Sequence, residues 1–258
     1  MIRVSDWALI TGAGSGIGAA LARELAGRGT GVVLVGRRQA SLDDVRASFV
    51  DNSSGVMIEA DIASASDRAR MGSDVSALLA EQGGHLRYLI HNAGVGVPSL
   101  NFVGINSSDL EYAFAVNVIA PLALTQLFLP ALRAADSSRV MLVGAGIADR
   151  PQPGTGIYGI TKKALARLFD QMLTDFDYEA DPGAPSLAMF QPGMVDTEGL
   201  RAHVDAAGAY NLPHADYLKT ALSSGGARRP ETVAKTMADA LLNLPVTDFH
   251  GQTLRPEK

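Results

Sequence analysis

The sequence predicts a doubly wound α/β domain, in which helices cover both faces of a parallel sheet. Short apolar runs alternate along the chain with longer segments of helical periodicity. This alternation is typical of strand, helix, strand units with right-handed crossovers. The length agrees, because 258 residues suit one domain over residues 1–258 better than two smaller ones.

Six apolar runs are the expected strands, and their nearly continuous apolar character fits burial on both faces: residues 7–10, 31–35, 56–58, 86–90, 140–143 and 186–190. Residues 17–28 are the first expected helix, since Ile17, Leu21 and Leu25 recur at every fourth position. The segment 198–229 interrupts this pattern, because it is rich in Gly, Ala and Ser. We expect a small, mobile substrate lid there.

Two longer helices are expected over residues 108–132 and 158–178, the first opened by a capping box of Ser108 and Glu111. Both helices can simply cover the sheet. Their apolar residues also suit a helix-bundle interface between two copies of the chain: Leu122, Leu124, Leu127, Leu165, Leu168, Phe169 and Met172. The sequence leaves both interpretations open.

Composition and charge exclude several classes of protein. With 47% hydrophobic and 19% charged residues the chain is globular rather than disordered or fibrous. Its net charge of −5 provides no basic field for nucleic acid. There are no cysteines, no signal-like start and no membrane-length apolar run, so we expect a cytoplasmic protein without a membrane partner. The histidines lack metal-ligand spacing, so no metal is expected, while His203 and His214 are candidate substrate contacts in the lid.

A glycine-rich turn, Thr11 to Gly18, directly follows the first expected strand and opens the first expected helix. Glycines allow a pyrophosphate to approach the backbone closely, and the helix N-terminus offers free N–H groups. Many such turns are purely structural, and it is the context that favours a dinucleotide site. Arg37 and Arg38 end the next expected strand, where a guanidinium suits a 2′-phosphate, so NADP(H) is preferred over NAD(H). The alternative is a solvated arginine pair.

Tyr158 and Lys162 lie four residues apart, on one face of an expected helix. A phenol has an ordinary pKa near 10, and a nearby ammonium group stabilises the phenolate and lowers that pKa. The pair is therefore a candidate acid–base group. Alone, this spacing is more often an amphipathic surface pair.

Together these residues resemble the short-chain dehydrogenase/reductase family, in its typical subclass of about this length. The motifs occur in the family order: Thr11 to Gly18, Asp61-Ile62, His91-Asn92-Ala93-Gly94, Asn117, Tyr158 with Lys162, and Pro192-Gly193 followed by Val195 and Thr197. The resemblance implies a Rossmann-type fold, a homodimer or homotetramer, and reduction of a ketone or aldehyde, or oxidation of the matching alcohol, with NADP(H).

The resemblance also implies roles for residues. Tyr158 would exchange a proton with the substrate oxygen, Lys162 would bind the nicotinamide ribose and lower the Tyr158 pKa, and Asn117 would hold a water for proton relay. The implied cofactor-binding residues are Thr11, Gly12, Ser15, Gly16, Ile17, Gly18, Arg37, Arg38, Asp61, Ile62, Asn92, Ala93, Gly94, Tyr158, Lys162, Pro192, Gly193, Val195 and Thr197.

One position departs from the family pattern. Ala145, thirteen residues before Tyr158, stands where the family usually carries a catalytic Ser that donates to the substrate oxygen. Thr155 is a nearby hydroxyl that could replace it. Three explanations stay open: a substrate that needs no such donor, a slow reductase, or a catalytically impaired NADP(H)-binding regulatory protein. Residues 152–158 also resemble sepiapterin and benzil reductases over a short stretch, which hints at vicinal dicarbonyl substrates.

Overall fold

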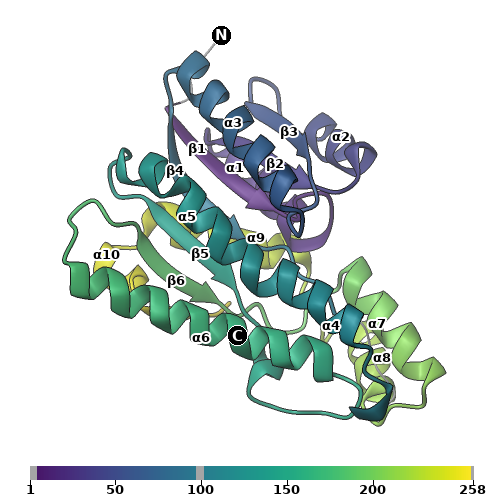
Figure 1. The fold of residues 1–258 in the computed structure, drawn as a ribbon. Helices are drawn as coiled ribbons and strands as arrows, with labels where there is room; N and C mark the ends of the chain where they lie inside the picture. Colours follow the sequence, from purple (N-terminus) through teal and green to yellow (C-terminus); the bar gives the residue numbers. More distant parts are fainter. Residues whose placement is uncertain (1–4, 97–101, 257–258) are drawn as a thin grey trace.

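A seven-stranded sheet runs through the molecule in the order β3-β2-β1-β4-β5-β6-β7 (Figure 1), and every strand pairing is parallel. The structure, a computed structural model, describes residues 5–96 and 102–256. Residues 1–4, 97–101 and 257–258 of the predicted domain lie outside these ranges. The sheet confirms the predicted doubly wound, Rossmann-type α/β fold.

The first six strands coincide with the six predicted apolar runs. Their bounds are β1 Asp6–Thr11, β2 Gly31–Gly36, β3 Gly55–Glu59, β4 His85–His91, β5 Arg139–Val143 and β6 Ser186–Phe190. The seventh, β7 Gln252–Leu254, pairs with β6 and was not predicted. Two of its three residues are exposed, so it has no apolar run to detect.

Alternate strand residues face two helical layers. Leu34 of β2 packs in the layer of α1 Gly16–Gly27, α2 Gln39–Ala47 and α9 Pro230–Asn243. Val33 and Val35 pack in the opposite layer, formed by α3 Ala65–Gln82, α5 Ala120–Arg133 and α6 Gly156–Glu179. The predicted helices 17–28 and 158–178 are therefore confirmed as α1 and α6.

The predicted helix 108–132 is present as one helical run with an irregular centre. α4, Ser107–Phe114, leads through a wide π-turn, Ala115–Ile119, into α5. Pro121 explains the wide turn, because it has no N–H for the carbonyl of Asn117 four residues earlier.

The predicted capping box at the start of this run is wrong. Asn106 is the N-cap, and its side-chain oxygen accepts the backbone N–H of Ser108 at 3.1 Å. Ser108 lies inside the helix, and its own hydroxyl also donates to Asn106. Asn caps a helix at least as well as Ser, so the helix begins one residue earlier than predicted.

The run Ser107–Arg133 is long and apolar enough, by length and composition, to cross a membrane, with a mean hydropathy of 1.7. Within the fold it serves as a core helix. Leu124, Phe128 and Leu132 are buried against the sheet. This packing accounts for part of the hydrophobic content, because Ile119, Leu122 and Leu127 of the same run are exposed.

The predicted lid segment is helical rather than irregular. α7, Glu198–Ala209, and α8, Ala215–Ser223, form a hairpin with its own small apolar cluster of Ala207, Leu212 and Ala215. In Figure 1 this hairpin lies beside α4, at the end of the sheet where the strands finish. Its position fits a substrate lid, which remains a prediction.

Candidate active site

The site begins where the strand order reverses, between β1 and β4, because loops at the carboxyl ends of these strands leave in opposite directions. The Thr11 hydroxyl accepts the backbone N–H groups of Asn92 and Ala93 at 3.1 and 3.2 Å and donates to Ile90. The Asn92 amide in turn donates to the carbonyls of Thr11 and Gly12. These two side chains therefore join the two predicted motif loops to each other.

The glycines of the first turn are required by close backbone contacts. A Cβ on Gly18 would lie 2.3 Å from the Gly12 carbonyl oxygen, and a Cβ on Gly12, whose φ is +68°, would lie 2.9 Å from the Ala93 Cα. Ser15 precedes α1 but makes no capping hydrogen bond with its side chain. The first N–H groups of α1 thus face the turn without a side-chain cap, which fits the predicted pyrophosphate cradle.

The predicted Pro192 to Thr197 segment closes this cradle from the side of β6. The Thr197 methyl group lies 3.0 Å from where a Cβ of Gly16 would be, and the Thr197 hydroxyl caps α7 by accepting the Leu200 N–H. Gly193 has a φ of +73°, and Val195 is buried in the core. Thr197 is thereby held at the N-terminus of α1.

The adenosine end of the predicted site contains two exposed arginines, Arg37 and Arg38, after β2. Arg37 Nη1 donates to the Tyr112 hydroxyl at 2.7 Å, and that hydroxyl donates to Asp61 at 3.4 Å. Ile62, the residue after Asp61, is buried. Tyr112 could not be predicted from the sequence, because nothing in its spacing connects α4 with the loops after β2 and β3.

The candidate acid–base pair lies against the loop after β4. A Cβ on Gly96 would lie 2.7 Å from the Tyr158 ring, and a Cβ on Gly94 would lie 3.2 Å from Lys162 Nζ. Lys162 is 2% exposed, donates to the Val143 carbonyl at 2.9 Å, and has its Nζ 5.6 Å from the centre of the Tyr158 ring. Gly96, which was not predicted as a site residue, leaves the space that the Tyr158 ring occupies.

Asn117 is fully buried in the π-turn and faces the same loop. Its side chain accepts the Val95 N–H at 2.9 Å and donates to the Val95 carbonyl and to the Thr161 hydroxyl, at 2.7 and 2.8 Å. The side chain therefore anchors the loop. Pro121 has no N–H to donate to the Asn117 carbonyl, and the relay water at Asn117 remains a prediction. Thr161 is a further supporting residue that the sequence analysis did not identify.

The predicted lowering of the Tyr158 pKa is opposite to what the structure shows. Burial disfavours the phenolate and raises the pKa of Tyr158 to about 12. Burial also disfavours the ammonium form of Lys162 and lowers its pKa to about 8. At neutral pH the phenol is protonated, and Lys162 carries most of its charge.

Replacing Lys162 with Met is expected to stabilise the protein near pH 7 by about 2 kcal/mol. The shift from 10.5 to about 8 corresponds to about 3 kcal/mol of destabilisation of the charged form, less about 1 kcal/mol for the hydrogen bond to Val143. Between pH 8 and 10.5 the unfolded chain binds more protons, so wild-type stability rises with pH and the advantage of the variant shrinks.

Urea unfolding at pH 7 and pH 10 measures this difference. The control is Lys163→Met, because Lys163 is exposed and paired with Asp149, and it is expected to show no such pH dependence. A Lys162→Met protein that is less stable than wild type by the same amount at both pH values would contradict the expectation.

Ala145 is half-exposed in extended backbone just beyond β5, and it caps a short 3₁₀ turn, Gly146–Ala148, that packs against the start of α6. The suggested substitute, Thr155, donates its hydroxyl proton to the Gln152 carbonyl at 2.8 Å. Its one O–H is therefore already engaged, and the structure does not support a replacement role for it.

The histidines form internal contacts. His91 is buried beside Thr125 at 2.9 Å, and burial lowers its pKa to about 3, so the ring is neutral. His203 and His214 join α7 to the start of α8 through their Nε2 atoms, 3.2 Å apart. In this arrangement they hold the hairpin together. No group of three or more potential metal ligands occurs within residues 5–96 and 102–256.

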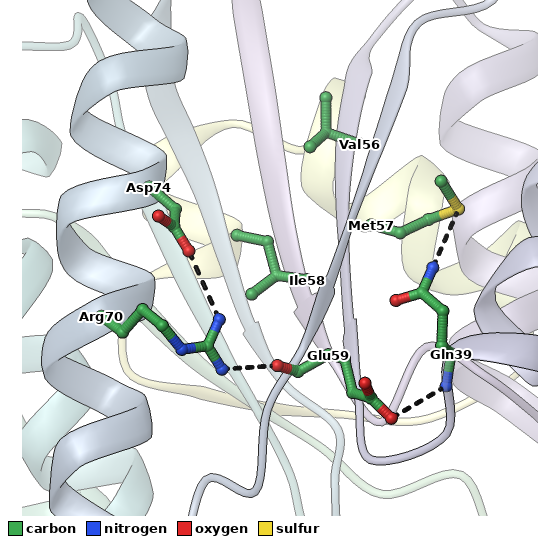
Figure 2. Close-up of a pocket in the computed structure, with 7 residues that line it drawn as sticks. All are labelled: Gln39, Val56, Met57, Ile58, Glu59, Arg70 and Asp74. Carbon is green, nitrogen blue, oxygen red and sulfur yellow. Dashed lines mark hydrogen bonds and ion pairs between the residues drawn. The ribbon is translucent and has the colours of Figure 1, made fainter.

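A hollow of about 480 Å³ lies along the free edge of β3 (Figure 2). Ser54 and Ala60 form backbone hydrogen bonds to β2. Because backbone groups alternate in direction along a strand, the N–H and C=O groups of the odd-numbered β3 residues point away from β2, toward the open edge. Arg46 donates to the Gly55 carbonyl and Arg70 to the Glu59 carbonyl. The two arginines cover carbonyls that would otherwise be open to another strand.

The short chain dehydrogenase family model matches residues 6–207, and the chain belongs to this family. The benzil reductase ((S)-benzoin forming) of Bacillus cereus is 25% identical over 236 residues, which cover 91% of this chain and 93% of that one.

Solved structures share the fold. A metagenomic short-chain oxidoreductase in complex with NADP has a TM-score of 0.76 at 23% identity and covers 99% of this chain and 100% of its own. A 3-ketoacyl-(acyl-carrier-protein) reductase from Brucella melitensis, complexed with NADH, has a TM-score of 0.80 at 22% identity, covering 97% and 96%. The family and the site together define an NAD(P)-dependent oxidoreductase.

Proposed function

We propose that this protein is an NADP(H)-dependent oxidoreductase that reduces a ketone or aldehyde to the alcohol, with Tyr158 as the acid–base group. The observation that carries the proposal is the convergence of Tyr158, Lys162 and Asn117 on the loop Gly94 to Gly96. This loop lies at the carboxyl edge of the sheet, next to the glycine-rich turn that fits a dinucleotide.

In the forward reaction the Tyr158 hydroxyl donates its proton to the carbonyl oxygen while the carbonyl carbon accepts a hydride, and the product is the alcohol. A bound reduced nicotinamide supplies the hydride. The Lys162 ammonium lies near the ring and stabilises the phenolate left behind. The Asn117 carbonyl holds the water through which Tyr158 regains a proton. With a pKa raised to about 12, the Tyr158 phenol is protonated at neutral pH and can donate a proton to the carbonyl oxygen.

The test is NADPH consumption by the wild-type protein over ketones, aldehydes and vicinal diketones, alongside NADPH binding measured by fluorescence. Benzil belongs in the panel, because a relative with 25% identity is named for its reduction. Turnover of at least one carbonyl with formation of the alcohol supports the proposal. Binding of NADPH without turnover of any class of carbonyl contradicts it.

Ala145 favours a second candidate function, a catalytically impaired NADP(H)-binding regulatory protein. One donor to the substrate oxygen is missing at this position, and Thr155 does not replace it. Under this alternative the protein binds NADPH tightly and reduces no carbonyl. Binding without turnover in the panel described above would favour this function.

The proposed preference for NADP(H) rests on Arg37 and Arg38, which are exposed at the adenosine end of the site. Replacing both with Ala is expected to raise the Kd of NADPH by about 10²-fold, because a 2′-phosphate loses its charge-assisted hydrogen bonds. The Kd of NADH is expected to change by less than about threefold, since NADH has no 2′-phosphate. Isothermal titration with both cofactors measures the two changes. Equal weakening of NADPH and NADH would contradict the assignment.

We also propose a homodimer or homotetramer in the cytoplasm, acting on small molecules and without a nucleic-acid or membrane partner. Leu124, Leu165, Phe169 and Met172 are buried within the chain and cover the sheet, so these four do not form an interface. Four other apolar residues of the run Ser107–Arg133 and of α6 remain exposed on the surface, and they suit a contact between copies: Ile119, Leu122, Leu127 and Ile160.

A further inference from the structure

Two loops and a helix meet at the adenosine end of the site through the hydroxyl group of Tyr112. Arg37 follows β2, Asp61 follows β3, and Tyr112 comes from α4. Arg37 Nη1 lies 2.7 Å from the Tyr112 hydroxyl oxygen, and that oxygen lies 3.4 Å from Asp61 Oδ2. The order of donors is fixed by chemistry, because a guanidinium only donates and a carboxylate only accepts. The hydroxyl therefore accepts from Arg37 and donates to Asp61.

The two partners of Tyr112 differ in how firmly the rest of the structure holds them. Asp61 is held by its own loop, since Oδ1 accepts the Ala63 N–H at 3.0 Å. Arg37 is exposed. Within the described residues, its side chain makes one polar contact, the hydrogen bond to Tyr112. Arg has a long side chain with many rotamers, whereas the half-buried Tyr112 ring has few. Tyr112 thus limits the positions that the Arg37 guanidinium can take.

We propose that Tyr112 is a positioning residue that sets the preference for a 2′-phosphate, and this inference rests on the proposed function. One of the five N–H groups of Arg37 is bound to Tyr112, and four remain for a phosphate. Fixing the guanidinium beforehand lowers the entropy lost when the phosphate binds. The hydroxyl also donates to Asp61 Oδ2, so Tyr112 is itself held from the loop after β3.

The test uses Tyr112→Phe, which removes only the hydroxyl, with Tyr178→Phe as control because Tyr178 is 90% exposed on α6. Isothermal titration measures the Kd of two probes, adenosine 2′,5′-bisphosphate and adenosine 5′-monophosphate. We expect Tyr112→Phe to weaken the bisphosphate about tenfold and the monophosphate by less than about twofold. Tyr178→Phe is expected to match wild type with both probes.

A second comparison shows whether Tyr112 acts through Arg37. The variants Arg37→Ala and Arg37→Ala with Tyr112→Phe are expected to bind the bisphosphate equally, since the phenol has nothing left to position. A further loss in the double variant would overturn the inference, as would equal weakening of both probes or tighter bisphosphate binding by Tyr112→Phe. If wild type itself binds the two probes equally, the proposed NADP(H) preference fails, and the inference fails with it. If wild type prefers the bisphosphate and Tyr112→Phe is unchanged, only the role of Tyr112 fails.

Discussion

Replacing Tyr158 with Phe is expected to lower kcat for carbonyl reduction by about 10³-fold or more, because the substrate oxygen loses its proton donor. The ring keeps its place against Gly96, and Lys162 keeps its hydrogen bond to Val143. NADPH binding is therefore expected to change by less than about threefold. Steady-state turnover and cofactor titration on the same preparation separate the two effects.

Tyr178→Phe is the matched control, as the same chemical change at an exposed position of the same helix. Turnover by Tyr158→Phe above about a tenth of wild type would show that another group protonates the substrate. A rise in rate with pH toward 12 in the alcohol-oxidation direction, present in wild type and absent in the variant, would independently identify the phenol. Its pKa is raised to about 12, so the phenolate needed for oxidation accumulates only at high pH.

The second large effect is expected from Ala145→Ser, with kcat rising about 10²-fold, which is the usual value of one preorganised donor to a developing oxyanion. The backbone at Ala145, φ −152° and ψ 139°, accepts Ser without strain. The turn that follows Ala145 packs against α6, the helix that carries Tyr158.

Ala148→Ser is the control, because it adds the same hydroxyl three residues further along the same turn. Steady-state kinetics on carbonyls of different reactivity measures the change in kcat for each variant. A kcat for Ala145→Ser that is equal to or below the wild-type value would contradict the expectation, and it would favour a substrate that needs no donor from this position. A rise from low but measurable turnover would identify a slow reductase.

The strands and the glycine-rich turn could be predicted from the sequence because their signals are local. A buried parallel strand needs a nearly continuous apolar run, and β1 to β6 each have one. β7 has none, since it lies at the sheet edge with Gln252 and Thr253 exposed. The helices of the lid were missed because their Gly and Ala content weakens the periodic signal.

The contacts that organise the site could not be predicted, because they join distant segments. No spacing links Tyr112 to Arg37 and Asp61, or His203 to His214. The direction of the Tyr158 pKa shift depends on burial, which a motif does not reveal, and the Lys162 spacing alone suggested the opposite sign. The positions of the acid–base residues along the chain were evident, but their electrostatic environment was not.

The lid has a consequence for how this protein could diversify. The hairpin begins at Glu198, directly after its N-cap Thr197, and the chain returns at Arg228, whose backbone bonds to Met194 and Asp196. The two ends of the hairpin segment are thus held side by side, so the residues between them form an insertion with adjacent ends. The length and sequence of such an insertion can change between related proteins without moving a strand or the acid–base pair. As the predicted substrate lid, the hairpin would let substrate choice change separately from the acid–base chemistry.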